Sequence, residues 1–391
     1  MSSWYLLFLL LAADWPEWRG PHRDAVVFEE PKSWPEKLKL KWKTEVGIGH
    51  SSPITAAGSI YEFARQGDQE TVLSLDPSNG KIRWKQQYAA PYKMNEAAVG
   101  HGEGPKATPV YANGKLYTFG ISGILSAFDA ETGKPLWRLD FSKQYKEGAP
   151  DFGTAMSPVV DKGLLIAHVG GTKLGALTAF DAATGVVKWT WNGDSPAYSS
   201  PIVVEMSGVR QVVTQSHSNI VGVAVDSGKL LWKIPFTTEY DQNIVTPVLY
   251  KDTLIFSGID KGVFAVRNTQ VVWKNKDVSM YMSSPVVSGD LLFGFSHLKK
   301  GQLFCLDART GATLWTGPPR AGDNAAILAS SSTLYALIPD GQLTIAKPTA
   351  TGLNEIRRYE VAESPTWAHP VVLGDGVLIK DLKTIARWGV D

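Results

Sequence analysis

The sequence has almost no cysteine, no excess of either charge and no long apolar run after its start. Cys305 is the only cysteine in 391 residues, which excludes an internal disulfide and any metal site built from several cysteines. Cys305 lies in the apolar run LFCL, which is typical of a buried side chain rather than a reactive thiol. The 39 basic residues balance the 38 acidic ones, so nothing in the charge favours binding to nucleic acid or an anionic membrane. No later segment is long and apolar enough to form a stable membrane span.

The first residues, MSSWYLLFLLLAAD, contain an apolar run that is too short to cross a bilayer. We interpret residues 1–13 as a signal peptide with Ala13 as the cleavage point, which predicts a periplasmic or secreted bacterial protein. The fit is imperfect, because no Lys or Arg precedes the run and Leu11 stands where a small residue is favoured. A misplaced start codon or a weak anchor are the alternatives.

The sequence is rich in glycine, proline and tryptophan, and it repeats itself. Seven tryptophans end similar units and follow one another at intervals of 41 to 53 residues, with Tyr359 in the matching place of a weaker copy. A motif such as SSPI or ATPV precedes each unit. A period near 40 residues indicates structural repeats that bury their faces against one another. The clearest copies are SLDPSNGKIRW (74–84), AFDAETGKPLW (127–137), AFDAATGVVKW (179–189), AVDSGKLLW (224–232) and CLDARTGATLW (305–315).

Each unit reads as four short strands separated by glycine-containing turns, for example TPVYA, GKLYTFG, GILSAFD and KPLWRLDF. Four strands in about 40 residues are the mark of a β-propeller blade. We expect Asp129 and Thr132 to hydrogen-bond the turn backbone and Gly133 to supply a positive φ, so that Trp137 packs against the next blade. A calcium loop in DAETG is the less favoured reading, because the acidic residues differ among the copies.

The number of strands predicts how the ring closes. The C-terminal unit provides three strands, and LKLKWKTEV (38–46) near the N-terminus provides one more with Trp42. Pairing the two completes an eighth blade and ties the chain ends together without leaving a free sheet edge. We therefore predict an all-β fold: an eight-bladed β-propeller over residues 37–391, preceded by an arm over residues 14–36 whose WPEWRGP segment packs on the outside.

The pattern A-x-D-x-x-T-G-K-x-x-W of residues 127–137 resembles the tryptophan-docking motif of the pyrroloquinoline-quinone-like (PQQ-like) propellers. The resemblance covers the chain after Trp15, although AVRNTQVVW (265–273) lacks the Asp and the Gly. It implies either a quinoprotein dehydrogenase or a non-catalytic scaffold such as the outer-membrane assembly lipoprotein. WPEWRGPHRD also resembles the start of a group of exported bacterial proteins with the same repeats and no agreed activity.

The chain departs from both branches of this family. It lacks the adjacent cysteine pair that the alcohol dehydrogenases carry over the quinone, the haem-attaching C-x-x-C-H, and the lipid-modified cysteine of the scaffold lipoprotein. We therefore expect no cofactor, with PQQ disfavoured, and no metal. The family resemblance alone does not assign a reaction.

Candidate binding residues lie in the segments before the S-P and T-P motifs and in the loops between second and third strands, which meet at one mouth of a propeller. These segments carry histidines, aromatics and acids that differ from blade to blade, which predicts an asymmetric polar funnel. The candidates are His50, Arg65, Asn95, His101, Glu103, Lys106, Asp151, Tyr198, His217, Tyr240, Asp241, Asn243, Asp260, Tyr281, His297, Lys299, Asp323, Asn324, Trp367 and His369.

We expect a monomeric, exported, non-catalytic binding or scaffold protein whose partner is a small polar ligand, such as a sugar, or another exported or outer-membrane protein. The alternative is an oxidoreductase of the quinoprotein type or another sugar-active enzyme that uses the funnel. FGISG (119–123) and VGGTKLG (169–175) match neither a nucleophile elbow nor a phosphate loop, and we interpret both as turns.

Overall fold

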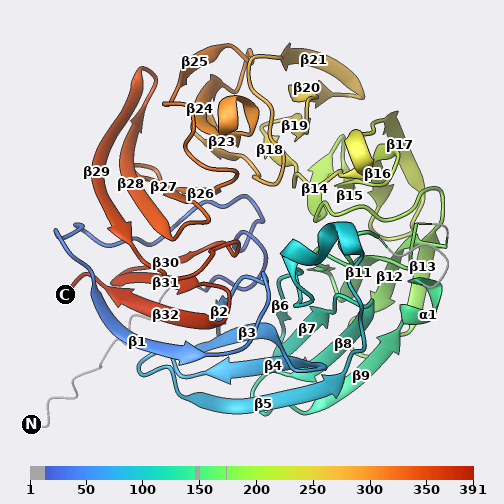
Figure 1. Ribbon diagram of the computed structural model, residues 1–391. Coiled ribbons are helices and arrows are strands. Elements are labelled where there is room, and N and C mark those ends of the chain that lie inside the picture. The colour runs from blue at the N-terminus through green and yellow to red at the C-terminus, as the bar shows by residue number, and fades with distance from the viewer. Residues whose placement is uncertain (1–13, 146–149, 173) are drawn as a thin grey trace, which may run out of the picture.

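Eight four-stranded antiparallel sheets surround a common centre in the computed structural model, which describes residues 14–145, 150–172 and 174–391. Figure 1 shows the sheets in chain order around the ring, with the first strand beside the last. The predicted all-β, eight-bladed propeller is confirmed. The predicted signal peptide lies outside the described residues.

Within blades 1 to 7 the strands follow one another outward from the centre in chain order. Blades 1 to 4 contain β2 (Ile54–Ala56), β3 (Ser59–Gln66), β4 (Gln69–Leu75) and β5 (Ile82–Ala89); β6 (Val110–Ala112), β7 (Lys115–Phe119), β8 (Ile124–Asp129) and β9 (Pro135–Asp140); β10 (Val159–Asp161), β11 (Leu164–Val169), β12 (Ala176–Asp181) and β13 (Val187–Trp191); and β14 (Ile202–Met206), β15 (Val209–Gln215), β16 (Asn219–Ala224) and β17 (Leu230–Pro235).

The second half of the ring follows the same plan. Blades 5 to 8 contain β18 (Val248–Tyr250), β19 (Thr253–Gly258), β20 (Gly262–Arg267) and β21 (Gln270–Asn275); β22 (Val286–Ser288), β23 (Leu291–Ser296), β24 (Gln302–Asp307) and β25 (Thr313–Thr316); β26 (Ala326–Ala329), β27 (Leu334–Leu337), β28 (Gln342–Thr349) and β29 (Gly352–Glu360); and β30 (Val371–Leu373), β31 (Gly376–Lys380), β32 (Thr384–Gly389) and β1 (Lys39–Glu45). The short helices are η1 (Glu96–His101), α1 (Ser142–Tyr145), η2 (Glu239–Asp241) and η3 (Leu298–Lys300).

The ring closes by pairing its two ends, as the number of strands predicted. Strand β1 lies antiparallel to β32 with Lys39 opposite Gly389 and Glu45 opposite Thr384. Trp42 on β1 then reaches into blade 1, where its indole N–H donates to the carbonyl oxygen of Pro77 at 2.9 Å. The eighth blade is therefore composed of one N-terminal and three C-terminal strands.

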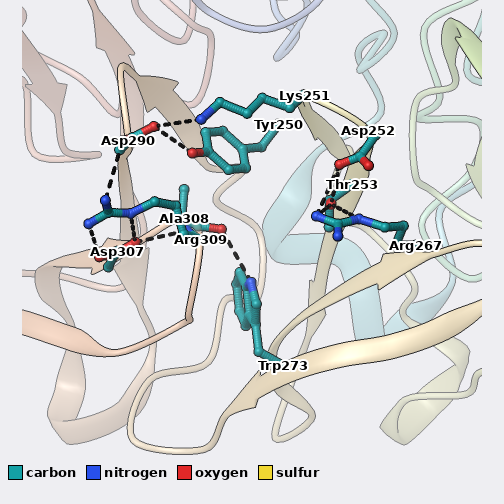
Figure 2. A network of polar contacts seen from close by, with 10 residues as sticks. All are labelled: Tyr250, Lys251, Asp252, Thr253, Arg267, Trp273, Asp290, Asp307, Ala308 and Arg309. Atoms are coloured by element: carbon teal, nitrogen blue, oxygen red, sulfur yellow. Dashed lines mark hydrogen bonds and ion pairs between the residues drawn. The ribbon is translucent and has the colours of Figure 1, made fainter.

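Neighbouring blades are joined by the repeated tryptophan. The Trp84 indole of blade 1 donates to the carbonyl oxygen of Ala130 in blade 2 at 3.0 Å and lies over Gly133, whose φ is +73°. A Cβ at Gly133 would lie 2.6 Å from the ring, so glycine serves both the turn and the contact. Figure 2 shows the same contact between blades 5 and 6, where Trp273 donates to the carbonyl oxygen of Ala308 at 3.2 Å.

The contact is missing between blades 4 and 5. The turn of blade 5 has Asn268 and Thr269 in place of the Asp-containing, glycine-ended turn. Trp232 of blade 4 instead donates its indole N–H to Gln211 Oε1 of its own blade at 2.6 Å. It folds over Gly222, where a Cβ would lie 2.2 Å from the indole. The loss of the motif in one turn therefore changes the partner of the preceding tryptophan.

A ring of polar residues lines the centre at the second position before each innermost strand. The backbone N–H of Ser52 donates to Thr108 Oγ1 at 3.1 Å, and that of Thr108 donates to Ser157 Oγ at 2.9 Å, so each hydroxyl joins two blades. This contact explains the S-P and T-P motifs, because the hydroxyl residue directly precedes the proline. In chain order the ring contains Ser52, Thr108, Ser157, Ser200, Thr246, Ser284, Asn324 and His369.

The N-terminal arm enters this centre, and the expectation that WPEWRGP packs on the outside is wrong. The Trp18 indole donates to Thr246 Oγ1 in blade 5 at 3.0 Å, and Arg23 donates to the carbonyl oxygen of Ser157 in blade 3 at 2.9 Å. Arg19, between them, is fully buried. Figure 1 shows this blue segment within the ring. The arm thus closes the axis of the propeller.

The rest of the arm lies against blade 7. Val26 forms a parallel bridge with Ala329, and the Tyr335 hydroxyl donates to the Glu30 carboxylate. The Trp34 ring packs edge-on against Tyr335 with centroids 5.8 Å apart. Blade 7, whose own repeat is degraded, therefore gains apolar and polar contacts from the arm.

Candidate functional site

Four of the predicted residues join an aromatic chain across the mouth of the ring. The His50 and His101 rings lie 5.8 and 5.9 Å from Trp367, and the His50 Nε2 atom lies 2.8 Å from the carbonyl oxygen of His101. Phe152 packs edge-on against His101 at 5.0 Å and against Tyr198 at 5.7 Å. The chain therefore runs through five successive connecting segments, which lead into blades 8, 1, 2, 3 and 4.

Beside the end of this chain is a hollow of 220 Å³ that five predicted residues line. The His217 Nε2 atom lies 3.3 Å from Asp241 Oδ2, and the backbone N–H of Phe152 donates to the Tyr198 hydroxyl at 3.4 Å. Tyr240 is 72% exposed with a φ of +57°. The residues around this hollow, which we call the rim hollow, are Pro150, Asp151, Thr172, Pro196, Tyr198, His217, Tyr240 and Asp241.

A second hollow of 400 Å³ adjoins the rim hollow at Pro150 and Asp151. Asn95 donates to Asp151 Oδ1 at 2.8 Å, so an amide of the segment after blade 1 holds the carboxylate that the two hollows share. Tyr92 lies here too, and burial raises the pKa of its hydroxyl to about 12. The two hollows together present carboxylates and phenol hydroxyls to solvent.

Burial and like charge lower the pKa values of the basic groups at the mouth. Burial lowers the pKa of Lys106 to about 8, and its ammonium donates to the carbonyl oxygen of Gly102 at 3.2 Å. Burial, with the Lys106 charge second, lowers the pKa of His50 to about 4 and also lowers that of His101. At neutral pH this part of the mouth therefore contains neutral imidazoles beside one ammonium that is readily deprotonated.

A separate cluster lies on the opposite side of the mouth. The Tyr281 hydroxyl donates to the side-chain oxygen of Gln242, and the Tyr281 ring lies 6.2 Å from His297. The His297 Nε2 atom is 3.2 Å from Asp260 Oδ1. Tyr281, His297 and Asp260 are thus brought together, but with each other rather than with the aromatic chain.

Other predicted residues have their polar atoms bound to backbone. Arg65 is 3% exposed and donates to the carbonyl oxygen of Ala90 at 2.9 Å, and the Asn243 amide donates to three carbonyl oxygens. Glu103 accepts from the backbone N–H of Met94. His369 differs from these residues, because its ring is 5% exposed and packs beneath Trp18, with ring centroids 4.5 Å apart. These contacts stabilise the connecting segments.

The remaining predicted residues differ in exposure. Lys299 and Asp323 are exposed, whereas Asn324 is 6% exposed and belongs to the polar ring below the mouth. The structure therefore divides the predicted set into an aromatic chain with its rim hollow, a second cluster, and residues that hold the backbone. Phe152 and Gln242 were missed, because an apolar side chain and an amide in such segments carry no signal of their own.

The described part of the chain contains no group of three His, Cys, Asp or Glu side chains placed to hold a metal ion. None of its helices is long and apolar enough to span a bilayer. Other hollows lie away from the mouth, including one of 180 Å³ beside Trp232 where the blade contact fails.

Eight blades joined by docked tryptophans define a β-propeller with PQQ-like repeats. The sequence profile of the family described as "Outer membrane protein assembly factor BamB" matches residues 68–317, which is more than half of the 391 residues. The chain belongs to this family, and the resemblance inferred from the repeated motif is confirmed.

The curated relatives include both assembly factors and quinone-dependent dehydrogenases. Outer membrane protein assembly factor BamB from Shewanella oneidensis is 27% identical over 249 residues, which are 56% of this chain and 59% of that protein. The Yersinia pestis protein of the same name is 24% identical over 70% of this chain and 69% of its own length. The dehydrogenase subunit of alcohol dehydrogenase (quinone) from Komagataeibacter europaeus is 30% identical over 39% of this chain, but only 21% of that enzyme. The bacterial assembly factors agree with the expected export.

Solved structures share the fold at low sequence identity. A europium-containing methanol dehydrogenase has a TM-score of 0.73 and 14% identity, with 94% of this chain and 89% of that chain covered. BamB from Moraxella catarrhalis has a TM-score of 0.65 and 14% identity, with coverage of 90% and 100%. Because an enzyme and an assembly factor match alike, this likeness supports the propeller and leaves the activity to other evidence.

Proposed function

We propose that this protein is a non-catalytic scaffold of the bacterial periplasm that binds other proteins of outer-membrane assembly at the mouth of its ring. The observation that carries this proposal is the closed axis, with Trp18 packed on His369 and Arg19 fully buried below the mouth. The accessible recognition surface is therefore the broad mouth, with its aromatic chain and rim hollow, rather than a deep funnel. Membership of the assembly-factor family supports the same reading.

The residues present do not fit the quinone of the dehydrogenase relatives. PQQ is a flat polyanion that needs a slot between two stacking surfaces and a cation beside its carbonyl oxygens. The arm fills the axis, the only thiol in the sequence is buried within β24, and the described residues offer no cluster of metal ligands. We therefore propose that the chain acts without this cofactor, and we derive no reaction through it.

A second candidate function is recognition of a small polar ligand in the rim hollow. Its carboxylates, its imidazole and its two phenol rings converge on 220 Å³, which is room for a small molecule or for one side chain of a protein partner. No contact in the hollow favours a sugar over other polar groups. The same residues would therefore serve a protein partner or a small ligand, and an experiment must distinguish these two functions.

The test measures binding of the purified, full chain to the purified outer-membrane assembly proteins of its own host by surface plasmon resonance. Alanine at Tyr198 or at Asp151 should weaken binding by about 5- to 150-fold, which corresponds to 1–3 kcal/mol for a lost hydrogen-bonding or aromatic contact. Lys251→Ala is the matched control, because Lys251 is exposed near the turn network in Figure 2, away from the mouth. Equal binding by wild type and both rim variants would contradict a docking site at the mouth.

A ligand screen on the same proteins separates the second candidate. A small molecule that raises the Tm of the wild type, but not that of Tyr198→Ala, would identify the rim hollow as its site. Binding of an assembly protein that persists when the hollow is saturated would show that the hollow and the partner site are different. Reduction of a dye in the presence of an alcohol would contradict the non-catalytic proposal.

A further inference from the structure

The polar ring at the centre is incomplete in blades 7 and 8. Six of its positions carry Ser or Thr, whereas these two carry Asn324 and His369. Asn324 is 6% exposed, and neither atom of its amide group has a hydrogen-bond partner among the described residues. The Nδ1 atom of His369 is likewise buried without a partner. One sector of an otherwise bonded ring therefore holds unpaired polar atoms.

Arg19 of the arm lies at this sector. Its Nη2 atom donates to the carbonyl oxygens of Asp24 and of Pro285 in blade 6, and its charge lowers the pKa of His369 in blade 8, after burial as the larger cause. Asn324 occupies the ring position between those two blades. The Nε and Nη1 atoms of Arg19 are buried and have no partner in the described chain.

The charge of Arg19 has no ion-pair partner among the described residues. The neighbouring Arg23 pairs with Glu17 at 2.5 Å, whereas Arg19 contacts Asp24 only through the backbone carbonyl. The Asp24 carboxylate is near enough to favour the charged guanidinium, but it accepts the Val26 N–H. A buried guanidinium without a counter-charge and with unpaired N–H groups is strongly unfavourable.

We infer that a small anion binds on the propeller axis between the Arg19 guanidinium, the Asn324 amide and the His369 imidazole. Arg19 contributes charge and N–H groups, Asn324 contributes an NH₂ group, and a neutral His369 with its proton on Nδ1 contributes another donor. Because the three unpaired groups are shielded from solvent, the site selects an anion the size of chloride or bromide and excludes a bulky organic anion.

The anion would fasten the arm within the ring, because Arg19 belongs to the arm whereas Asn324 and His369 belong to blades 7 and 8. Its binding free energy therefore adds to the stability of the folded chain. By linkage, an anion that binds only the native state raises Tm as its concentration rises. A non-specific salt effect would act on every variant alike.

The test follows Tm of the full chain by circular dichroism while chloride replaces gluconate from 10 to 300 mM at constant ionic strength. Wild type should gain about 3 °C or more, as expected for a native-state ligand near saturation. Arg19→Met, which removes the charge and keeps the volume, should lose this dependence. Arg387→Met is the matched control and should keep the gain, since it removes a guanidinium on β32 that donates to Pro77 of blade 1 and Asp375 of blade 8.

If Arg19→Met does not fold, Asn324→Asp provides a second test of the anion site. A carboxylate at this position would pair with Arg19 and take the place of the anion, so Tm should be independent of chloride without a loss of stability. Crystals soaked in bromide should show an anomalous peak between the three side chains. A wild-type Tm that is indifferent to the anion, or a chloride gain that survives in Asn324→Asp, would overturn the inference.

Discussion

One carboxyl group at the closing seam of the ring should contribute less to stability as pH rises towards neutrality. Glu62 on β3 of blade 1 is fully buried. Burial raises its pKa to about 8, and the charge of Lys380 on β31 of blade 8 and the Phe63 N–H oppose this rise only partly. Native Glu62 therefore keeps its proton at a pH where the unfolded chain has released it.

The sign and size of the effect follow from these two pKa values. Between pH 4.5 and about 8 the Glu62 carboxyl is more protonated in the native state than in the unfolded state, so its contribution to stability decreases as pH rises through this window. At pH 7 the difference corresponds to roughly 2.5 pKa units, or about 3 kcal/mol. Glu62→Gln removes the titration and keeps the side-chain volume. We expect the variant to gain about 3 kcal/mol relative to wild type between pH 4 and pH 7.

Urea denaturation at pH 4, 5, 6 and 7, followed by tryptophan fluorescence, measures this difference directly. The change of the difference with pH is the predicted quantity, because the replacement of a carboxyl group by an amide beside Lys380 adds an offset that does not depend on pH. Glu205→Gln makes the same replacement at an exposed position on β14 and should give a curve parallel to wild type. Parallel curves for Glu62→Gln as well would refute the reasoning.

Three further predictions concern the ring and its activity. Trp189→Ala should cost about 4 kcal/mol, because its indole is buried and donates to Val225. Trp232→Ala should cost about half as much, since its indole makes its hydrogen bond within blade 4 rather than to blade 5; equal costs in urea denaturation would contradict this. A chain that begins at Gly47 lacks the arm and β1 and should melt at least about 10 °C lower or aggregate, so an unchanged Tm would disprove the closure described here. Purified protein supplied with PQQ and calcium should not reduce a dye with alcohols or glucose, and reduction would contradict the absence of the cofactor.

The blades could be predicted because each is specified by residues close together in sequence. Asp129, Thr132 and Gly133 form one turn, and Thr132 donates to Asp129 Oδ1 at 2.7 Å, so the same short motif reproduces the same turn wherever it recurs. The closing strand was predictable from the number of strands, because the C-terminal unit has three strands where the other units have four. Local turn chemistry repeated at a fixed interval is thus sufficient for the architecture.

The site was less predictable because its contacts are formed between blades. Arg65 and Asn243 have the polar side chains expected of a ligand site, yet they bind carbonyl oxygens that sequence cannot place near them. The segment with Trp18 and Arg19 has no repeat, so its path into the axis depends entirely on distant contacts. Phe152 illustrates the converse, since an apolar residue connects two predicted ones.

The pairing of β1 with β32 sets an order for folding. The first strand of the propeller must wait for the last one to be synthesised, and until then blade 8 is incomplete and blade 1 lacks the Trp42 contact. The arm precedes β1 in sequence but enters an axis that exists only when the blades have assembled around it. Contacts of such high sequence separation form slowly and leave unpaired strand edges exposed in the meantime. The N-terminal segment, synthesised first, is therefore the last to reach its native place, and refolding should show a late kinetic phase that reports its insertion.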